Sequence, residues 1–332
     1  TDWYLRAAVA MSFLVLVAAN GLYFFNTTLA VNFWMLLAIL AGFTAVRHRH
    51  VSLINSARTS FSFSFGLALV VLLAVGVCFG VGRLWAADMA YARAQIFSQK
   101  SDTLNKAYDE LVKAVNFNPY RDTYRIGLAQ VLLAQANQEA NKPVAKNDDE
   151  KKSQLTTLEN YIKSSIAAAR SATDLSPKNV ANWEALGSVY RGTVLFARDA
   201  EGWIIDSFQN AIQLEPSNPA LYTELGKAYL ISANRKRQVA GQLKDKAKTD
   251  LEAEAAVQVA KALEQFNQAV KLKENYTPAH FNQALALEQQ GKVDEAIDKL
   301  ERMKLVNPQD IDVLYELGSL YYGKNELDKS QT

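Results

Sequence analysis

The chain has 332 residues, a formal net charge of +2 and one cysteine, Cys78. Its near-neutral charge creates no strong field for nucleic acid, so nucleic acid is not an expected partner. A single cysteine excludes an intrachain disulfide and a cysteine-based metal cluster. Charge is nevertheless uneven, because residues 1–85 are almost free of it and residues 100–332 carry nearly all of it.

Residues 1–85 have the composition of a membrane segment that would contact the lipid bilayer. Residues 7–46 contain no Asp, Glu, Lys or Arg, and such a stretch is too long for one span of about 20 residues. A polar cluster around Asn26 predicts a turn inside it, which gives transmembrane helices at about 4–25 and 29–46. A third apolar run, charged only near its end, predicts a helix at about 61–84.

The loop between the second and third predicted spans carries Arg47, Arg49 and Arg58. Short loops rich in Arg and Lys stay on the cytoplasmic side of a membrane. The third helix would then run outward. We therefore expect an integral membrane protein with residues 86–332 on its extracytoplasmic side.

A helical repeat pattern follows the apolar region. The stretch that begins at Trp183 contains W-x2-L-G-x2-Y, a return stretch that begins at Phe208 contains F-x2-A-x4-P, and the pattern restarts at Tyr222. Large apolar residues at i, i+3 and i+7 give each helix one apolar stripe. Proline then ends the second helix. This segment resembles the tetratricopeptide (TPR) repeat, two antiparallel helices in about 34 residues.

The resemblance implies an all-α fold in which three transmembrane helices precede a solenoid of about five to six helix pairs over residues 86–332. Helical insertions are expected near residues 137–155 and 234–256. The first is charged and disorder-like in composition, and its helix is expected to resume near Leu155. The second insertion is rich in helix formers. It predicts a protruding helical hairpin bent near Gly241 or Lys248.

TPR arrays use their first helices to line a groove that binds peptides or partner helices. The resemblance therefore implies a groove for a protein or peptide partner, and the mixture of side chains suits an extended acidic or polar segment. The alternative is that these are ordinary solvated residues. The positions carried over from the family are Arg125, Glu184, Arg191, Thr223, Lys227, Asn282, Gln289, Tyr315 and Tyr322. Trp183 is instead expected to pack between helices.

No catalytic motif is present in the sequence, neither G-x-S-x-G, H-E-x-x-H, a Walker loop nor a Rossmann fingerprint. His48 and His50 lie in the basic loop with no third ligand nearby, which favours solvated residues over a metal site. We therefore expect no cofactor, no metal and no catalytic residue in this chain, and whether it is part of an enzyme stays open.

A broader resemblance concerns the order of segments. An aromatic-rich turn, GLYFFNTTLAVNFW, is followed by a basic loop, one more helix and RLWAADMAYARAQ leading into the repeats. This layout is similar to the C-terminal part of bacterial O-antigen ligase or polymerase-like membrane proteins with a TPR tail. The resemblance implies a bacterial inner (cytoplasmic) membrane as the location, and it implies that the catalytic residues of such an enzyme lie upstream. Two functions stay open: a membrane-anchored scaffold, or the tail of a glycan transferase that contacts glycan or glycan-assembly enzymes.

Overall fold

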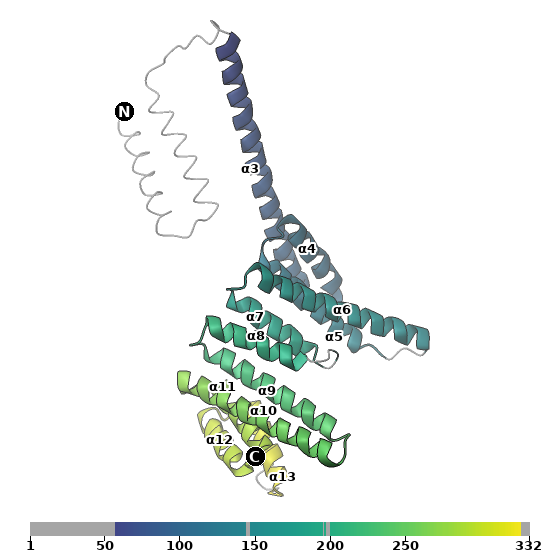
Figure 1. Ribbon diagram of the computed structural model, residues 1–332, viewed down its shortest axis with the longest axis vertical. Coiled ribbons are helices and arrows are strands. Elements are labelled where there is room, and N and C mark those ends of the chain that lie inside the picture. The colour runs from purple at the N-terminus through teal and green to yellow at the C-terminus, as the bar shows by residue number, and fades with distance from the viewer. Residues whose placement is uncertain (1–56, 144–146, 195, 197–199, 327–332) are drawn as a thin grey trace, which may run out of the picture. The chain divides into compact units, whose positions relative to one another are not determined.

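The computed structural model describes residues 57–143, 147–194, 196 and 200–326, without the side chains of 57–60 and 63. The first two expected membrane helices, at 4–25 and 29–46, lie outside the described residues, as do His48 and His50. The described residues form eleven α-helices and one short 3-10 helix with no strand (Figure 1), which confirms an all-α fold. The chain divides into two compact units, residues 1–76 and 77–332.

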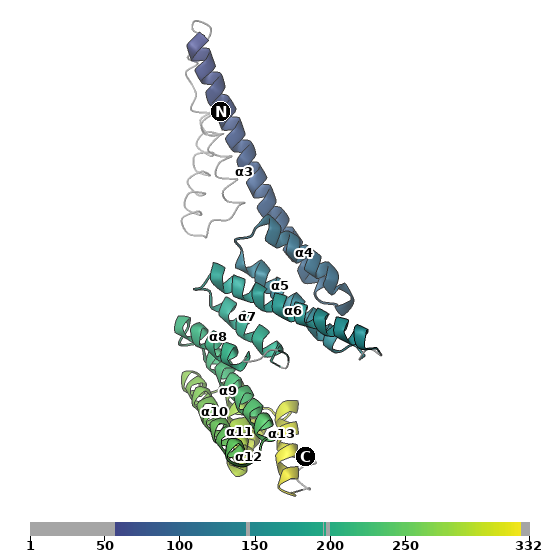
Figure 2. The same ribbon diagram turned by 45° about the vertical axis from the view of Figure 1, so that its right-hand side comes forward.

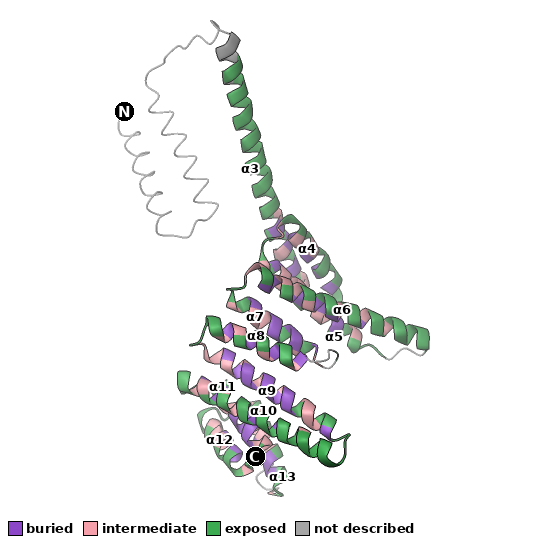
Figure 3. Ribbon diagram, in the orientation of Figure 1, coloured by how far each residue is buried: buried purple, intermediate pink, exposed green. Residues whose placement is uncertain are grey.

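Helix α3 (Ala57–Phe97) is one continuous helix of 41 residues. Its described side chains are all exposed from Phe61 through Trp85, as Figure 3 shows by the uninterrupted colour of exposed residues. Among the described helices, α3 alone contains a stretch, Ser64–Phe97, that is long and apolar enough to cross a membrane. Beyond Trp85 the same helix buries a face against the repeats, so the apolar stretch runs directly into the helical array.

The array consists of antiparallel helix pairs stacked in chain order (Figures 1 and 2). After the 3-10 helix η2 (Ser101–Thr103), the helices are α4 (Leu104–Phe117), α5 (Asp122–Ala140), α6 (Asp148–Leu175), α7 (Val180–Gly192), α8 (Ala200–Leu214), α9 (Pro219–Ala240), α10 (Asp245–Leu272), α11 (Thr277–Gln289), α12 (Val293–Val306) and α13 (Ile311–Gly323). The end of α3 with α4, and the pairs from α5/α6 to α11/α12, make five pairs, and α13 follows them.

Glycine opposite phenylalanine sets the spacing inside the two central pairs. A Cβ atom added at Gly187 would lie 2.8 Å from the ring of Phe208, and one added at Gly226 would lie closer still to the ring of Phe266. Both rings are about 1 % exposed or less. Trp183 packs against the same core and donates from Nε1 to the carbonyl of Pro177 at 2.8 Å, which confirms its packing role.

The two insertions extend the array as helices. Helix α5 continues to Ala140 and helix α6 begins at Asp148, so the first insertion is largely helical as expected, but the predicted restart near Leu155 is wrong by seven residues. The physical reason is an N-cap: the side chain of Asn147 accepts from the amide of Glu150 at 2.7 Å, and three acidic residues occupy the first turn, where the helix dipole favours them. The second insertion forms the hairpin of α9 and α10 with its bend at Gly241, as predicted, whereas Lys248 lies inside α10.

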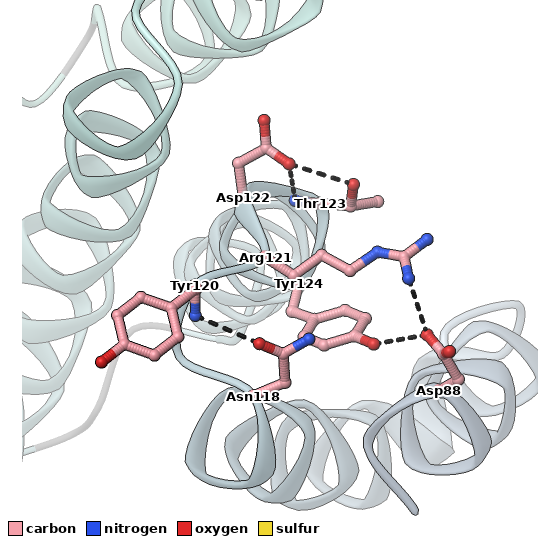
Figure 4. Close-up of polar contacts among 7 residues, drawn as sticks. All are labelled: Asp88, Asn118, Tyr120, Arg121, Asp122, Thr123 and Tyr124. Carbon is pink, nitrogen blue, oxygen red and sulfur yellow. Dashed lines mark hydrogen bonds and ion pairs between the residues drawn. The ribbon is translucent and has the colours of Figure 1, made fainter. Parts of the chain in front are cut away.

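A polar cluster joins α3 to the first complete pair (Figure 4). The hydroxyl of Tyr124 donates to Asp88, and Nη1 of Arg121 lies 3.1 Å from the same carboxylate oxygen. The ring of Tyr124 is buried against Tyr91, with ring centroids 5.2 Å apart. The start of α5 is thereby fixed to the end of α3.

Candidate functional site: the first-helix face

The first helices of the pairs, α5, α7, α9, α11 and α13, form what we call the first-helix face. Helix α5 packs on α7 and α9 packs on α11, whereas no two second helices pack comparably in the described part of the chain. Helices that approach one another more closely lie on the inner side of a curved stack. At these two junctions the first-helix face therefore lies on the inner side of the stack, which is the side where the sequence placed its candidate groove.

One recurring hydrogen bond fixes the register of the repeats. A side chain near the start of each of four first helices contacts the backbone carbonyl six residues earlier, at 2.7–3.0 Å. The four pairs are Arg125 with Pro119, Trp183 with Pro177, Tyr222 with Pro216, and His280 with Glu274.

This register corrects the alignment used for two repeats. By this hydrogen bond, Arg125 is the counterpart of Trp183 and not of Glu184, to which the sequence alignment matched it. The alignment was misplaced because α5 has neither the Trp nor the usual Leu-Gly step of the motif. In α11 the counterpart of Trp183 is His280. Asn282 and Gln289 therefore each lie one residue C-terminal to the groove position that the sequence alignment assigned to them.

Arg191 of α7 and Lys227 of α9 meet at one carboxylate, that of Glu224. Arg191 forms an ion pair with Glu224, and Nζ of Lys227 lies 2.9 Å from its other oxygen. Burial alone would raise the pKa of Glu224, but the hydrogen bond from Lys227 and the charge of Arg191 outweigh it and lower the pKa. Both predicted cations are therefore paired within the array, although one carboxylate offsets only one of their two positive charges, and an acidic ligand would have to compete with Glu224 for them.

Two acidic positions on this face have no cation partner among the described residues. Burial raises the pKa of Glu184, and the negative charges of Glu215 and Glu224 raise it further. Burial also raises the pKa of Glu316 on α13, next to Glu288 on α11, whose charge and hydrogen bond act in the same direction. Each carboxyl would be stabilised by an added positive charge.

The remaining predicted residues differ in how accessible they are. Thr223 and Asn282 are buried and donate to carbonyls of their own helices, those of Pro219 and Pro278. Gln289 accepts from Arg237 through both its side-chain and its backbone oxygen, at 2.8 and 2.9 Å. In contrast, the side chains most open to a ligand are Tyr315, 76 % exposed, and Tyr322, 70 % exposed.

Sequence reasoning missed Glu224, Glu288 and Glu316. A usable signal existed for the first: Glu224 lies 33 positions after Arg191, close to one repeat length, and three before Lys227. Those two spacings place it between the cations on neighbouring first helices. No spacing rule marks Glu288 and Glu316, because their approach depends on how α11 and α13 cross.

Comparison with known proteins places the fold. No known family profile and no curated relative matches the chain. Among solved structures, a tetratricopeptide repeat protein from Parabacteroides merdae superposes with a TM-score of 0.50 at 13 % identity, over 74 % of this chain and 77 % of that one. Pseudomonas aeruginosa pilF gives 0.48 at 16 % identity, over 75 % and 89 % of the two chains.

A third similar structure is YrrB, described as a TPR protein with an unusual peptide-binding site. Its TM-score is 0.38 at 21 % identity, over 66 % of this chain and 86 % of that one. Identities this low bear on fold alone. Together with the Gly–Phe packing and the recurring loop hydrogen bond, the Parabacteroides structure shows that the helical array of this chain has the TPR fold.

Proposed function

We propose that the protein is a membrane-anchored scaffold whose first-helix face binds an extended polypeptide segment. The observation that carries the proposal is that the first helices bury their apolar residues against neighbouring helices. Their charged side chains and the tyrosines of α13 remain accessible. The TPR fold is consistent with such a role. Anchoring is attributed to α3, whose exposed apolar stretch has the length and composition of a membrane span.

The distribution of charge on the face favours a segment that carries Lys or Arg. Arg191 and Lys227 already share Glu224, whereas Glu184 and the Glu288–Glu316 pair lack a positive partner among the described residues. A basic side chain bound there would relieve repulsion between carboxylates. Tyr315 and Tyr322, exposed on the same helix as Glu316, offer apolar and cation–π contact.

The test measures binding of fluorescent peptides to the full chain in nanodiscs. Matched peptides carrying Lys, Glu or Ser at the same positions would be compared by anisotropy, with Glu184→Gln and Glu316→Gln as variants. We expect the Lys peptide to bind most tightly, and each variant to weaken it by a few-fold to tenfold in a salt-dependent manner. Glu264→Gln, at an exposed position of the second helix α10, is the control and should change nothing.

Two outcomes would contradict this proposal. Tighter binding of the Glu peptide would restore the acidic-ligand hypothesis built on Arg191 and Lys227. An equal loss in Glu264→Gln would move binding off the first-helix face.

The alternative, the tail of a membrane glycan ligase, would make the same array a device that positions an acceptor or a partner enzyme. No observation in the described residues favours it over the scaffold. Reading the coding sequence upstream of Thr1 separates the two, because the ligase requires further spans and a large external loop there.

A further inference from the structure

Residues 117–121, which are the last residue of α4 and the loop between α4 and α5, lie beside the end of the apolar stretch of α3. Helix α4 runs back along α3: Arg93 pairs with Glu110 at 2.7 Å, and nearer the apolar stretch Nη2 of Arg83 donates to the carbonyl of Asn116 at 3.0 Å. The C-terminal end of α4 is therefore brought to the level of Arg83. The loop that follows is at the boundary where the exposed apolar helix becomes the array.

This loop is held in one conformation. Asn118 accepts from the amide of Tyr120 at 3.3 Å, Arg121 pairs with Asp88 at 3.1 Å, and the carbonyl of Pro119 accepts from Arg125 at 3.0 Å. Asp88 lies three residues after Trp85, about 4.5 Å along the helix at 1.5 Å per residue. The loop and Trp85 are thus within roughly one helical turn of each other along α3.

Tyr120 at the tip of the loop has no packing role in the array. Its side chain is 84 % exposed and points away from Tyr124 and Asp88 (Figure 4). Trp85 is 66 % exposed. The corresponding loops of the later repeats are polar at the position of Tyr120: they have Lys178, Ser217, Asn275 and Gln309. Among these described loops, only the one next to α3 carries an exposed aromatic ring at this position.

Tyr and Trp are enriched where a membrane meets water, because their rings are apolar while the hydroxyl or indole N–H keeps a polar partner. Arginines beside them can reach lipid headgroups with their guanidinium groups. Arg83 and Arg121 flank the two aromatic residues here. The combination has the chemistry of an interfacial anchor, and it adjoins a helix with the composition of a membrane span.

We propose that residues 117–121 and Trp85 form a second membrane contact, with Tyr120 inserted among the lipid headgroups and the first repeat seated on the bilayer surface. The inference rests on the membrane anchoring proposed above. Its consequence is orientation: a second contact to one side of the α3 axis restricts the tilt of the array relative to the bilayer, and so fixes which edge of the array faces the bilayer.

Cys78, the only cysteine in the sequence, makes the test direct. It is exposed on α3, seven residues before Trp85 or about 10 Å along the axis. A nitroxide label would be placed on Cys78 itself, and on the introduced thiols of two double variants, Cys78→Ser/Tyr120→Cys and Cys78→Ser/Phe117→Cys. The second of these keeps the tyrosine. Cys78→Ser/Ser217→Cys, labelled in the equivalent loop two repeats away, is the matched control.

Each full-length protein is reconstituted as one copy per nanodisc of phosphatidylethanolamine and phosphatidylglycerol, so that a second copy cannot cover the loop. Collision of the label with a water-soluble nickel complex and with oxygen then reports its depth. We expect the label at position 78 in hydrocarbon, the labels at 117 and 120 at headgroup depth, and the label at 217 in water. Exposure of positions 117 and 120 to the nickel complex should be several-fold lower than that of position 217.

The outcomes separate the two proposals. If the labels at 117 and 120 are as exposed to nickel as the label at 217 while position 78 stays shielded, the interfacial contact is refuted and the anchor stands. If position 78 is itself open to the nickel complex, α3 does not span the bilayer and both proposals fail.

Discussion

Helices α7 to α10 share one hydrophobic cluster that contains Phe208 and Phe266, whereas α3, α4 and α5 meet in two small clusters in which five of the eight buried residues are alanines. Alanine lets helices approach closely but removes little apolar surface from water per residue. The junction compensates with polar contacts, in which Asp88 binds Tyr124 and Arg121. The comparison indicates that the central pairs are stabilised by burial and the junction by geometry-dependent hydrogen bonds, so the two regions should respond differently to mutation and to pH.

The largest effect should come from Phe266→Ala. The ring is fully buried and fills the space left by Gly226, so its removal leaves a cavity and should lower the free energy of unfolding by about 3–5 kcal/mol. Urea unfolding of the full chain in detergent, followed by circular dichroism, measures it. The matched truncation at the junction is Leu111→Ala, which we expect to cost less. A larger loss at Leu111 would reverse the comparison.

A second test adds atoms instead of removing them. In Gly226→Ala the new methyl group would overlap the ring of Phe266, so we expect a loss of about 1–3 kcal/mol from overpacking. Gly187→Ala should lose less, because its Cβ would lie farther from the opposing ring. The control is Gly202→Ala in α8, where nothing lies within 4 Å of the added atom; there alanine should stabilise the helix by about 0.5–1 kcal/mol. Equal losses at all three positions would refute a steric cause.

The central region was also the more predictable from sequence. Its W-x2-L-G and F-x2-A motifs predict the packing directly. In both central repeats the motif glycine of the first helix lies opposite a phenylalanine of the second helix. The register of α5 was missed because its counterpart of Trp183 is Arg125. The helical start at Asp148 was missed because a charged composition was taken for disorder although Asn147 provides a cap. Glu224 and the Glu288–Glu316 pair depend on contacts between repeats, which a pattern within one repeat does not contain.

Between the two regions, a smaller effect is expected at Asp122. Its carboxylate accepts from Nδ2 of Asn179 and of Asn182, each at 2.9 Å, and so joins α5 to the start of α7. Burial alone would raise the pKa of Asp122, but these hydrogen bonds outweigh it and lower the pKa to about 2. A carboxyl with a lowered pKa stabilises the fold above its unfolded pKa of about 4 and loses that contribution as pH falls toward about 2.

Asp122→Asn should therefore cost about 1–2 kcal/mol at neutral pH, since hydrogen bonds to a charged, partly exposed group are weakened. It should also flatten the fall in stability between pH about 4 and about 2. Asp174→Asn, an exposed carboxyl on α6, serves as the control. An unchanged acid profile in Asp122→Asn would show that the contact does not persist in solution.

The smallest effect, and the most specific to the junction, is expected for Tyr124→Phe. Burial raises the pKa of Tyr124 to about 12, and the neighbouring Asp88 raises it in the same direction. A group whose pKa is raised on folding stabilises the protein fully below its unfolded pKa of about 10 and loses that contribution as pH rises toward about 12. The unaltered chain should therefore lose stability more steeply than Tyr124→Phe across this range. Near neutral pH the variant should lose about 1 kcal/mol, because Asp88 is half exposed and the hydrogen bond is partly replaced by water.

The control for this variant is Tyr120→Phe, which removes an exposed hydroxyl from the same loop. Some alkaline dependence should persist in every variant, since burial also raises the pKa values of Tyr229 and Tyr276. The informative quantity is thus the difference between Tyr124→Phe and Tyr120→Phe above a pH of about 10. If the two profiles coincide, the hydroxyl of Tyr124 does not hold α5 to α3. The buried contacts of the junction and the ion pairs of Arg121 with Asp88 and of Arg93 with Glu110 would then have to fix the array to the helix that we propose anchors it.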